Sequence, residues 1–380
     1  MKTRRILLLA GEESGLIYAE RLKNALQDAC PGEEMEFRGY QSEGFKTADL
    51  AVMGFWPVLK RLFFFLGVAR AMKRLIRTWQ PEVVVTVDYP GLNLKLAAYA
   101  KARGIPAVHV VCPQVWAWHQ GRIPKVAAAV TKLLCFFPFE PPLFAGTGLD
   151  ARFIGHPLAD VFAAETAQAA QRGKAKDAAR TLALLPGSRI GEIQRILPRL
   201  LQSLHLLVKN AKDFEVLVPA ANDRACAEIE RQVKANPPPA SVRLEIIRGK
   251  AREVLRQADC AAVASGTATL EAALARCPTV LVYAVSPLLA WFARRVIKGV
   301  RHIGLANVIA EKTGTPPPMP ELLQEAFTPE AVAARLSKWL ADSTARTEAV
   351  AALDATMALL KSDGDALGNA AREILACIRS

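Results

Sequence analysis

Several features are absent from this chain of 380 residues, and each absence excludes a class of protein. No apolar run approaches the roughly 18–20 residues that a membrane-spanning helix needs. The longest runs, 51–59 and 62–69, are separated by Lys60 and Arg61. The seven cysteines never occur at the spacing of a zinc or iron–sulfur site, so we expect reduced thiols and no bound metal. No Gly-x-Gly-x-x-Gly follows the first apolar segment, 6–10, which sets aside an NAD-dependent oxidoreductase.

The composition is that of a folded protein long enough for two domains. Hydrophobic residues make up 52% and charged residues 22%, values typical of globular chains. The net charge of +13 favours an anionic membrane surface or nucleic acid as partner. Because no nucleic-acid-binding signature or long basic run is present, we prefer the membrane and expect no nucleic acid. Glu12 and Glu13 follow the N-terminal apolar run, which does not fit an export signal, so we expect a cytoplasmic protein.

Short apolar runs alternate with amphipathic segments along the chain. Strands are predicted at 6–10, 36–38, 83–87, 107–111, 132–137, 151–154, 181–185, 215–219, 242–246, 260–264 and 279–283, and helices at 16–29, 94–102, 191–210, 224–236, 251–257, 268–275 and 288–296. Helices that alternate with continuously apolar strands indicate parallel sheets covered on both faces. We therefore predict an α/β fold of two Rossmann-like, doubly wound domains that face each other across a cleft.

A segment with few large apolar side chains divides the chain. Residues 163–176 are rich in Ala, Gln and Lys and are typical of a linker or bridging helix. We place an N-terminal domain at 1–165 and a C-terminal domain at 175–344. The tail from 329 is helical throughout in its pattern, and we expect helices from about 345 to 380 to return to the first domain.

The strongest functional signal is a strand, turn and helix at 182–200. An apolar strand at 182–185 is followed by the turn Pro186-Gly187-Ser188, and a helix begins near Glu192. Such a turn points backbone N–H groups at whatever lies above the strand end, and Arg189 adds a permanent cation. Together these groups suit a diphosphate.

A second segment of the same kind lies about eighty residues further on. A buried strand at 261–264 leads into the turn Ser265-Gly266-Thr267 and a helix at 268–275. The hydroxyls of Ser265, Thr267 and Thr269 either cap the helix or bind phosphate oxygens. Glu271 either favours the positive end of the helix dipole or reaches ribose hydroxyls. Two such loops in one half of the chain favour a nucleotide.

An aromatic cluster adjoins a basic stripe near residue 70. The apolar residues at 62–66 are followed by four basic residues on one helical face, Arg70, Lys73, Arg74 and Arg77. This pattern is typical of a helix that lies in the interface of an anionic membrane, with Phe63, Phe64 and Phe65 in contact with lipid. The alternative is a core helix with a solvated basic face, and the sequence leaves both open.

Taken in order, these and further motifs resemble the lipid-A-disaccharide synthase family of GT-B glycosyltransferases. The matching stretches are 10–15 (AGEESG), 51–54 (AVMG), Asp88, 115–118 (VWAW), 138–140 (PFE), 155–160 (GHPLAD), 185–189 (LPGSR), 265–271 (SGTATLE), 285–287 (VSP), Asn307 and 320–324 (PELLQ). No one motif decides the match. Their order and spacing from residue 10 to residue 324 make the resemblance specific.

The resemblance implies a reaction of lipid A biosynthesis. Diacylglucosamine would pass from UDP-2,3-diacylglucosamine to diacylglucosamine 1-phosphate, with inversion, formation of a β-1′,6 bond and release of UDP. Asp88 would be the catalytic base; its alternative role is to cap the loop before Pro90. No cofactor or metal is implied if Arg189 and the helix ends carry the charge of the diphosphate.

The resemblance also assigns the remaining site residues and partners. The UDP-sugar would contact Ser188, Arg189, Ser265, Gly266, Thr267, Thr269, Glu271, Asn307, Glu321 and Gln324. The acceptor side would include Glu12, Ser14, Gly15, Trp116, Trp118 and His156, of which the two tryptophans and the histidine are alternatively structural. The partners would be the two lipid substrates and the inner face of the inner membrane, with peripheral attachment; a homodimer stays open.

Four departures from the family pattern fall in the first domain. Leu16 stands where Asp is usual, 38–44 replaces a Gly-Gly-Pro-x-Met stretch, 89–93 (YPGLN) replaces Ala-Pro-Asp-Phe-Asn, and His119 stands where Arg is frequent. The motifs expected at UDP are intact. Two alternatives therefore stay open. One is a paralogue with another acceptor or a related reaction such as UDP-sugar epimerisation, and the other is a non-catalytic, membrane-associated binder of nucleotide sugars.

Overall fold

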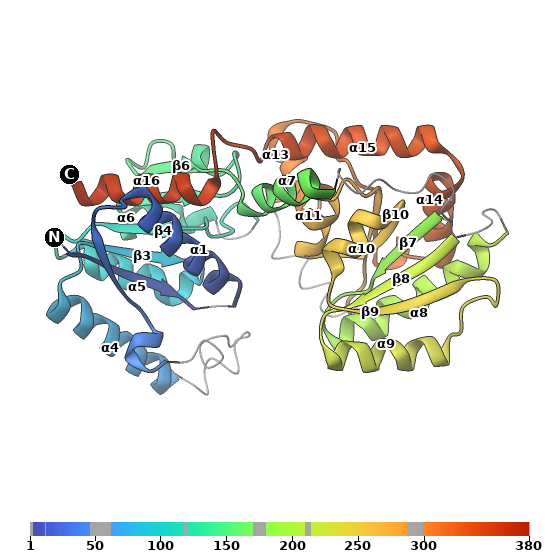
Figure 1. Ribbon diagram of the computed structural model, residues 1–380, viewed down its shortest axis with the longest axis horizontal. Helices are drawn as coiled ribbons and strands as arrows, with labels where there is room; N and C mark the ends of the chain where they lie inside the picture. Colours follow the sequence, from blue (N-terminus) through green and yellow to red (C-terminus); the bar gives the residue numbers. More distant parts are fainter. Residues whose placement is uncertain are drawn as a thin grey trace. The chain divides into compact units, whose positions relative to one another are not determined.

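Two parallel sheets of six strands each organise the chain, with helices packed against them (Figure 1). The computed structural model describes residues 3–11, 13–45, 62–117, 120–169, 180–209, 214–286 and 299–379. The chain forms two compact units, one of Met1–Asp160 with Leu360–Ser380 and one of Val161–Leu359. The predicted α/β class with two doubly wound sheets is confirmed.

The first sheet has the strand order β2-β1-β3-β4-β5-β6. Its strands are β1 (Thr3–Ala10), β2 (Glu34–Arg38), β3 (Val83–Val87), β4 (Ala107–Val110), β5 (Lys132–Cys135) and β6 (Asp150–Phe153). Alternate residues of β1 enter different cores, since successive side chains of a strand point to opposite faces. Ile6 and Leu8 pack with α1 (Glu13–Ala29) and α16 (Ala366–Arg379), and Leu7 and Leu9 pack with α4 (Leu62–Trp79) and α5 (Pro90–Lys101). The short helices of this unit are η1 (Gln41–Glu43), η2 (Gln120–Arg122), α6 (Ile123–Ala129) and η3 (Pro141–Phe144).

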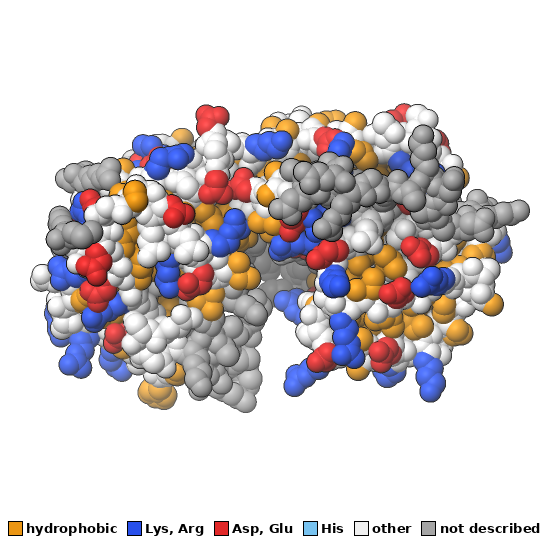
Figure 2. All heavy atoms as spheres, viewed as in Figure 1, with side chains coloured by type: hydrophobic (Ala, Val, Ile, Leu, Met, Phe, Trp, Pro, Cys, Tyr) orange, Lys and Arg blue, Asp and Glu red, His pale blue; other side chains and the backbone are white. Residues whose placement is uncertain are grey.

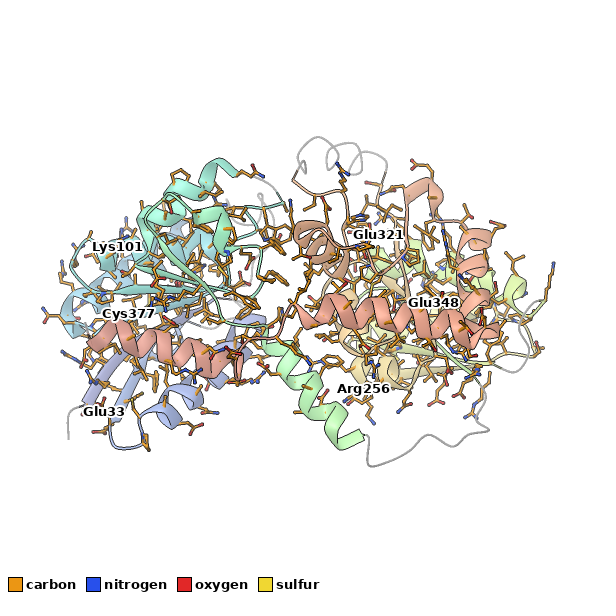
Figure 3. The ribbon with its side chains drawn as sticks, turned by 90° about the horizontal axis from the view of Figure 1, so that it is seen from above. Glu33, Lys101, Arg256, Glu321, Glu348 and Cys377 are labelled. Carbon is orange, nitrogen blue, oxygen red and sulfur yellow. The ribbon has the colours of Figure 1, made fainter. Side chains whose placement is uncertain are left out.

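The helix α16 brings the end of the chain back to the first sheet, as expected. Its residues Ala370 and Ile374 are buried in the same core as Ile6. Glu373 accepts hydrogen bonds from Lys132 Nζ at 2.5 Å and from Arg152 Nη1 at 2.7 Å, which joins the helix to β5 and β6. Figure 3 labels Cys377 near the far end of this helix.

The second sheet has the strand order β12-β11-β10-β7-β8-β9. Its strands are β7 (Arg180–Leu185), β8 (Phe214–Ala220), β9 (Arg243–Arg248), β10 (Cys260–Ala264), β11 (Thr279–Tyr283) and β12 (Glu321–Leu323). Its helices are α8 (Ile190–Leu207), α9 (Asp223–Ala235), α10 (Ala251–Gln257), α11 (Thr267–Leu274), α13 (Leu305–Thr313), η5 (Gln324–Ala326), α14 (Pro329–Ala341) and α15 (Ser343–Ala358). The predicted apolar face of α8, including Ile193 and Leu200, is fully buried against this sheet.

The chain passes from one unit to the other at residues 160 and 360. The sequence predicts these boundaries at about 165 and 345. The helix α7 (Pro157–Ala169) contains the first of these points. The helix α15 packs against α11 and α13, and Asp354 on it pairs with Arg276 at 2.8 Å. These contacts keep 343–358 with the second unit. The helix expected at 288–296 lies outside the described residues.

Each sheet has one point at which the chain reverses the direction of strand addition. In the first sheet β2 is added on one side of β1 and β3 on the other. In the second, β8 and β9 lie on one side of β7, and β10 lies on the other. Doubly wound sheets bind ligands outside the carboxyl ends of the strands at such switch points. The expected sites are therefore above β1 and β3, and above β7 and β10.

Candidate functional site

A cavity of about 370 Å³ lies at the switch point of the second sheet. Its lining comes from the loops after β7, β8, β9 and β10, and includes Ser188, Arg189, Ser265, Gly266, Thr267 and Glu271. These six residues were all predicted to hold the UDP-sugar from two loops about eighty residues apart in sequence. Because β7 and β10 are adjacent parallel strands, both loops leave the sheet at the same edge.

The turn after β7 depends on a glycine. Gly187 has φ +106°, and a Cβ at this position would lie 2.6 Å from Glu192 Oε2. The Glu192 carboxylate accepts hydrogen bonds from the backbone N–H of Arg189 at 3.5 Å and from Arg189 Nη1 at 3.0 Å. The side chain of Arg189 is 69% exposed, so it can exchange part of this exposed ion pair for a bound anion at little cost.

The turn after β10 has a similar dependence on Gly266, whose φ is +146°. Thr269 is buried, and its hydroxyl donates to Gly266 O at 2.8 Å, so this side chain closes the first turn of α11. The Ser265 hydroxyl donates to Ile303 O at 3.4 Å. Backbone N–H groups in the first turn of a helix have no partner within the helix, and Thr267 and Ala268 present that turn to the cavity.

Glu271 lines the cavity and has a cationic partner that the sequence analysis missed. Its Oε1 accepts from Arg252 Nε of α10 at 3.0 Å, and its side chain is only 16% exposed. The pair orients the carboxylate along the cavity wall. A separation of nineteen residues across two helices and a strand gives no periodic signal by which the sequence reveals this contact.

Three further residues predicted at the UDP-sugar bond neighbouring groups around β12. Glu321, labelled in Figure 3, accepts from the backbone N–H of Ile303 at 3.2 Å and of Gly304 at 3.1 Å and from Asn307 Nδ2 at 2.8 Å. Buried Asn307 also pairs with both backbone groups of Met319. The Gln324 amide, oriented to satisfy both of its ends, bonds the N–H and C=O of Val285. The bonds of Glu321 fix Ile303, whose carbonyl accepts from Ser265.

Asp88 lies at the switch point of the first sheet, directly after β3. It has φ +49° and Tyr89 has φ +51°, so two consecutive residues adopt the left-handed conformation. Burial raises the pKa of the Asp88 carboxyl, and the backbone N–H of Tyr89 partly offsets this. The helix α5 begins at Pro90 with Tyr89 at its N-cap and has no side-chain cap among the described residues.

The other acceptor-side predictions have different surroundings. A Cβ on Gly15 would contact Val87 O at 3.5 Å, which places the start of α1 beside the end of β3. Trp116 is buried and donates from Nε1 to Glu140 Oε1 at 3.1 Å. His156 is buried against Phe136, and burial lowers its pKa to about 4. Trp116 and His156 thus lie in the interior of the first unit. Glu12, Trp118 and the side chain of Ser14 lie outside the described residues.

Comparison with known proteins identifies the family. A family model described as lipid-A-disaccharide synthetase matches residues 6–374. The chain belongs to the lipid-A-disaccharide synthase family. It is 38% identical to the lipid-A-disaccharide synthase of Syntrophus aciditrophicus (strain SB), covering 88% of each chain. It is 37% identical to that of Anaeromyxobacter dehalogenans (strain 2CP-1 / ATCC BAA-258), covering 99% of this chain and 98% of the relative. As a member of this family the chain is a hexosyltransferase.

Solved structures with a similar fold include an epimerase and a glycosyltransferase. One is the UDP-GlcNAc 2-epimerase of Neisseria meningitidis bound to UDP-GlcNAc, with a TM-score of 0.58, 11% identity and 99% of each chain covered. The other is the calicheamicin glycosyltransferase, with a TM-score of 0.55, 15% identity, and 100% of this chain and 99% of that chain covered. At these identities the likeness shows the fold alone, which is that of the GT-B type.

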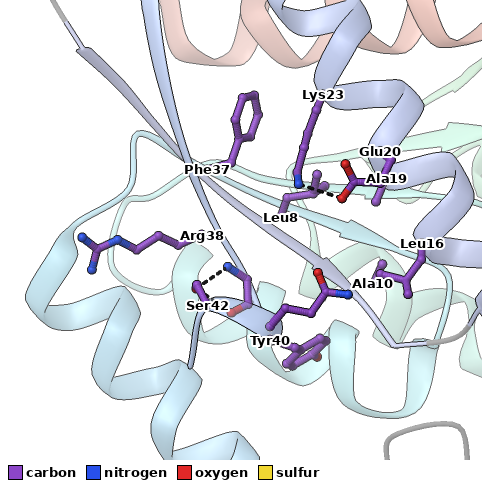
Figure 4. Close-up of a pocket in the computed structure, with 12 residues that line it drawn as sticks. Leu8, Ala10, Leu16, Ala19, Glu20, Lys23, Phe37, Arg38, Tyr40 and Ser42 are labelled. Carbon is purple, nitrogen blue, oxygen red and sulfur yellow. Dashed lines mark hydrogen bonds and ion pairs between the residues drawn. The ribbon is translucent and has the colours of Figure 1, made fainter. Parts of the chain in front are cut away.

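Two of the four departures from the lipid-A-disaccharide synthase pattern meet at one place in the first unit. Leu16 and 38–42 line a small cavity of about 100 Å³ beside the ends of β1 and β2 (Figure 4). Its lining includes the apolar Leu8 and Phe37 and the charged Lys23, which pairs with Glu20 at 2.8 Å. Residues that depart separately in sequence thus change one cavity.

The helix α4 has the basic face that the sequence predicted. Arg70, Lys73, Arg74 and Arg77 are all exposed, and basic side chains lie along this helix at the lower left of Figure 2. Phe63 is 85% exposed, whereas Phe64 and Phe65 are half-buried and pack on the core. Among the described residues, no helix has the length and apolar character to cross a bilayer.

Cys112, Cys135 and Glu140 form a buried group whose possible ligand atoms lie within 4.8 Å of one another. The sequence gives no sign of this group, because Cys112 follows β4 whereas Cys135 ends β5 and Glu140 lies in the loop after it. Burial raises the pKa of Glu140 to about 8, and a hydrogen bond with Cys135 together with burial raises the pKa of the Cys112 thiol. Glu140 also accepts from Trp116 and from Phe137 N at 3.1 Å. These shifts favour the protonated forms of Glu140 and Cys112.

Proposed function

We propose that the chain transfers diacylglucosamine from UDP-2,3-diacylglucosamine to diacylglucosamine 1-phosphate and releases UDP. The observation that carries the proposal is the cavity at the second switch point, where six predicted residues from two separate loops meet. Family membership supports the same reaction. The epimerase of similar fold that is bound to UDP-GlcNAc supports a nucleotide sugar as the donor.

In the proposed donor site, the diphosphate lies above the ends of β7 and β10. Arg189 and the first-turn N–H groups of α8 and α11 would neutralise the charge that develops on the leaving UDP. The Ser265 and Thr267 hydroxyls would donate to phosphate oxygens. Glu271, held by Arg252, would accept hydrogen bonds from the ribose hydroxyls. The Glu321–Asn307 network would act one step away, by fixing Ile303 and through it Ser265.

Asp88 is the proposed base. Its carboxylate would take the proton of the acceptor 6-hydroxyl as the oxygen forms a bond to C1 of the donor sugar. The bond from C1 to the diphosphate oxygen breaks at the opposite face, so the configuration inverts and UDP leaves with the electron pair. Burial raises the pKa of Asp88, which makes its carboxylate a stronger base than an exposed aspartate.

The proposed location is the surface of an anionic membrane, because both sugar substrates carry acyl chains. The exposed basic face of α4 and the exposed Phe63 beside it support this docking. Peripheral attachment by this helix would bring the first unit to the acceptor lipid.

The reaction is tested by UDP release from UDP-2,3-diacylglucosamine, with and without diacylglucosamine 1-phosphate. We expect release that requires the acceptor in the native chain and a loss of at least a hundredfold in kcat for Asp88→Asn, since general base catalysis contributes about 10²–10⁴-fold. UDP affinity should be unchanged in this variant. Binding of the UDP-sugar without acceptor-dependent turnover would contradict the proposal.

One observation favours an alternative function, in which the same donor sugar is transferred to a different acceptor. The departures at Leu16 and 38–42 change a single cavity in the first unit, on the side expected to receive the acceptor. Turnover with another lipid or sugar phosphate, but not with diacylglucosamine 1-phosphate, would show that the chain is a glycosyltransferase with a different acceptor. Formation of an epimerised UDP-sugar with no acceptor would replace the reaction itself.

A further inference from the structure

The turn that carries Asp88 is strained and needs an external support. Asp88 and Tyr89 have φ of +49° and +51°, and neither is a glycine. Residues with a Cβ populate this region sparsely, so consecutive examples persist where surrounding contacts impose them. The Tyr89 ring also lies where a side chain on Gly11 would be, 2.5 Å from an added Cβ. The turn is therefore packed against the end of β1.

One buried amide bonds the backbone at the start of this turn. Asn93, fully buried on α5, donates from Nδ2 to Asp88 O at 2.8 Å and to Val87 O at 3.2 Å. The same Nδ2 lies 3.2 Å from Leu9 O of β1. A single NH₂ group thus ties the ends of both switch-point strands to the carbonyl of Asp88.

The orientation of that amide is set by a tyrosine from a distant loop. Tyr40 is 3% exposed, and its hydroxyl donates to Asn93 Oδ1 at 2.6 Å. Because the Tyr40 hydroxyl donates to the oxygen end of the Asn93 amide, the NH₂ end of that amide is directed toward the three carbonyls. Tyr40 belongs to 38–44, the stretch that departs from the family pattern.

A close backbone contact places Tyr40. An added Cβ on Gly39 would lie 2.3 Å from Leu8 O, so the chain after β2 can pass against β1 only without a side chain there. The Ser42 hydroxyl bonds both the N–H and the C=O of Gly39, at 3.0 and 2.9 Å. These contacts hold the backbone on both sides of Tyr40.

We propose that Tyr40 and Asn93 are positioning residues for the reaction, which hold the Asp88 carboxylate in its productive orientation. The inference rests on the proposed role of Asp88 as base. Tyr40 acts through Asn93, to which its buried hydroxyl is bonded. Without the Tyr40 hydroxyl, the Asn93 amide can rotate by half a turn and exchange its oxygen and NH₂ ends. The strained backbone at Asp88 and Tyr89 can then relax.

The test is Tyr40→Phe in the full chain, compared with Tyr99→Phe as the matched control. Tyr99 lies on α5 and stacks on Arg103 at 3.5 Å through its ring face, which phenylalanine retains. We expect Tyr40→Phe to lower kcat at least tenfold and to change the KM for the UDP-sugar less than twofold. A relaxed, more hydrated Asp88 should also move the acid limb of the kcat/KM profile to lower pH. Tyr99→Phe should change none of these.

The outcomes separate this inference from the proposed function. If Asp88→Asn is inactive but Tyr40→Phe matches the control in kcat and in pH profile, the positioning role is wrong and the base assignment stands. If Asp88→Asn keeps acceptor-dependent turnover, the base assignment is wrong and this inference goes with it. Should Tyr40→Phe fail to fold, the double variant Tyr40→Phe/Asn93→Leu leaves neither member of the pair unpaired. Full kcat in that variant would equally overturn the positioning role.

Discussion

Gly187 and Gly191 are four residues apart, yet the structure gives an added methyl group opposite consequences at the two positions. At Gly187 the φ of +106° and the 2.6 Å approach to Glu192 Oε2 both oppose a Cβ. At Gly191, inside α8, an added Cβ meets only Arg195 Nη1, at 3.4 Å, among the described residues. The two glycines therefore make a matched pair for the turn that faces the cavity.

We expect Gly187→Ala to lower stability by about 1–3 kcal/mol through backbone strain, and to weaken UDP binding because the turn must shift. Gly191→Ala should keep UDP affinity and raise stability by up to about 1 kcal/mol, since alanine favours a helix over glycine. Urea unfolding and calorimetric titration with UDP measure the two effects. Equal UDP affinities in the two variants would show that the turn does not contact the diphosphate.

Arg189 is the cation expected to bind the diphosphate directly. A hydrogen bond to a charged group contributes about 1.5–3 kcal/mol, so Arg189→Met should weaken UDP binding roughly 10- to 100-fold. Arg195 lies on the same helix and donates to Gly191 O at 3.2 Å, which makes Arg195→Met a control for the loss of one positive charge. If both variants bind UDP equally well, general charge rather than Arg189 attracts the nucleotide. Isothermal calorimetry at two salt concentrations distinguishes these cases.

At the scale of elements, the helix α4 is the one proposed to bind the anionic membrane. Phe63 is 85% exposed, so Phe63→Glu should preserve folding and abolish flotation with vesicles that contain anionic lipid. Phe64 instead packs edge-on against Phe45 and Phe65, so Phe64→Glu should destabilise the first unit through burial of a charge. Vesicle binding by Phe63→Glu equal to that of the native chain would leave α4 as a solvated helix of the core.

The elements that the sequence predicted best are those with continuous apolar runs and clear boundaries. The strands β3, β10 and β11 begin and end as expected, because each is a continuous, mostly buried apolar run. The edge strand β2 begins two residues before the predicted start at Glu36, since its exposed Glu34 and half-buried Met35 break the apolar pattern. Contacts between distant segments gave no such signal. Tyr40 and Asn93 are fifty-three residues apart, and only the fold brings them together.

At the scale of the whole molecule, buried titratable groups set how stability depends on pH. His109 and His156 in the first unit each have a pKa lowered by burial from 6.5 to about 4. Below pH 6.5 the unfolded chain binds a proton at each histidine and the folded chain does not. Stability therefore falls as the pH drops from 6.5 to 4, with a full effect of about 3 kcal/mol for each group. Nε2 of His109 has no partner among the described residues, which fits the neutral form.

Glu140 acts in the opposite sense. Burial raises its pKa from 4.5 to about 8, so the folded chain keeps a proton that the unfolded chain releases above pH 4.5. Its contribution is complete below pH 4.5 and is lost as the pH rises through 8. Between pH 4.5 and 6.5 the two histidines outweigh Glu140 by one proton, so stability rises with pH. Between pH 6.5 and 8 only Glu140 of these three groups contributes, so stability falls. The three groups together give the first unit a stability maximum near pH 6.5.

Glu140→Gln should therefore remove the decline between pH 6.5 and 8, which is about 2 kcal/mol, whatever its effect on absolute stability. His109→Gln should halve the contribution of the histidines and flatten the rise from 4.5 to 6.5, since one proton of Glu140 then opposes one of His156. Pulse proteolysis in urea, with fragments assigned to each unit by mass, measures these slopes for the first unit separately. If the native chain gains stability from pH 6.5 to 8 and Glu140→Gln follows it in parallel, Glu140 is ionised in the folded protein. The buried group with Cys112 would then hold a negative charge, and its internal hydrogen bonds would have to be assigned again.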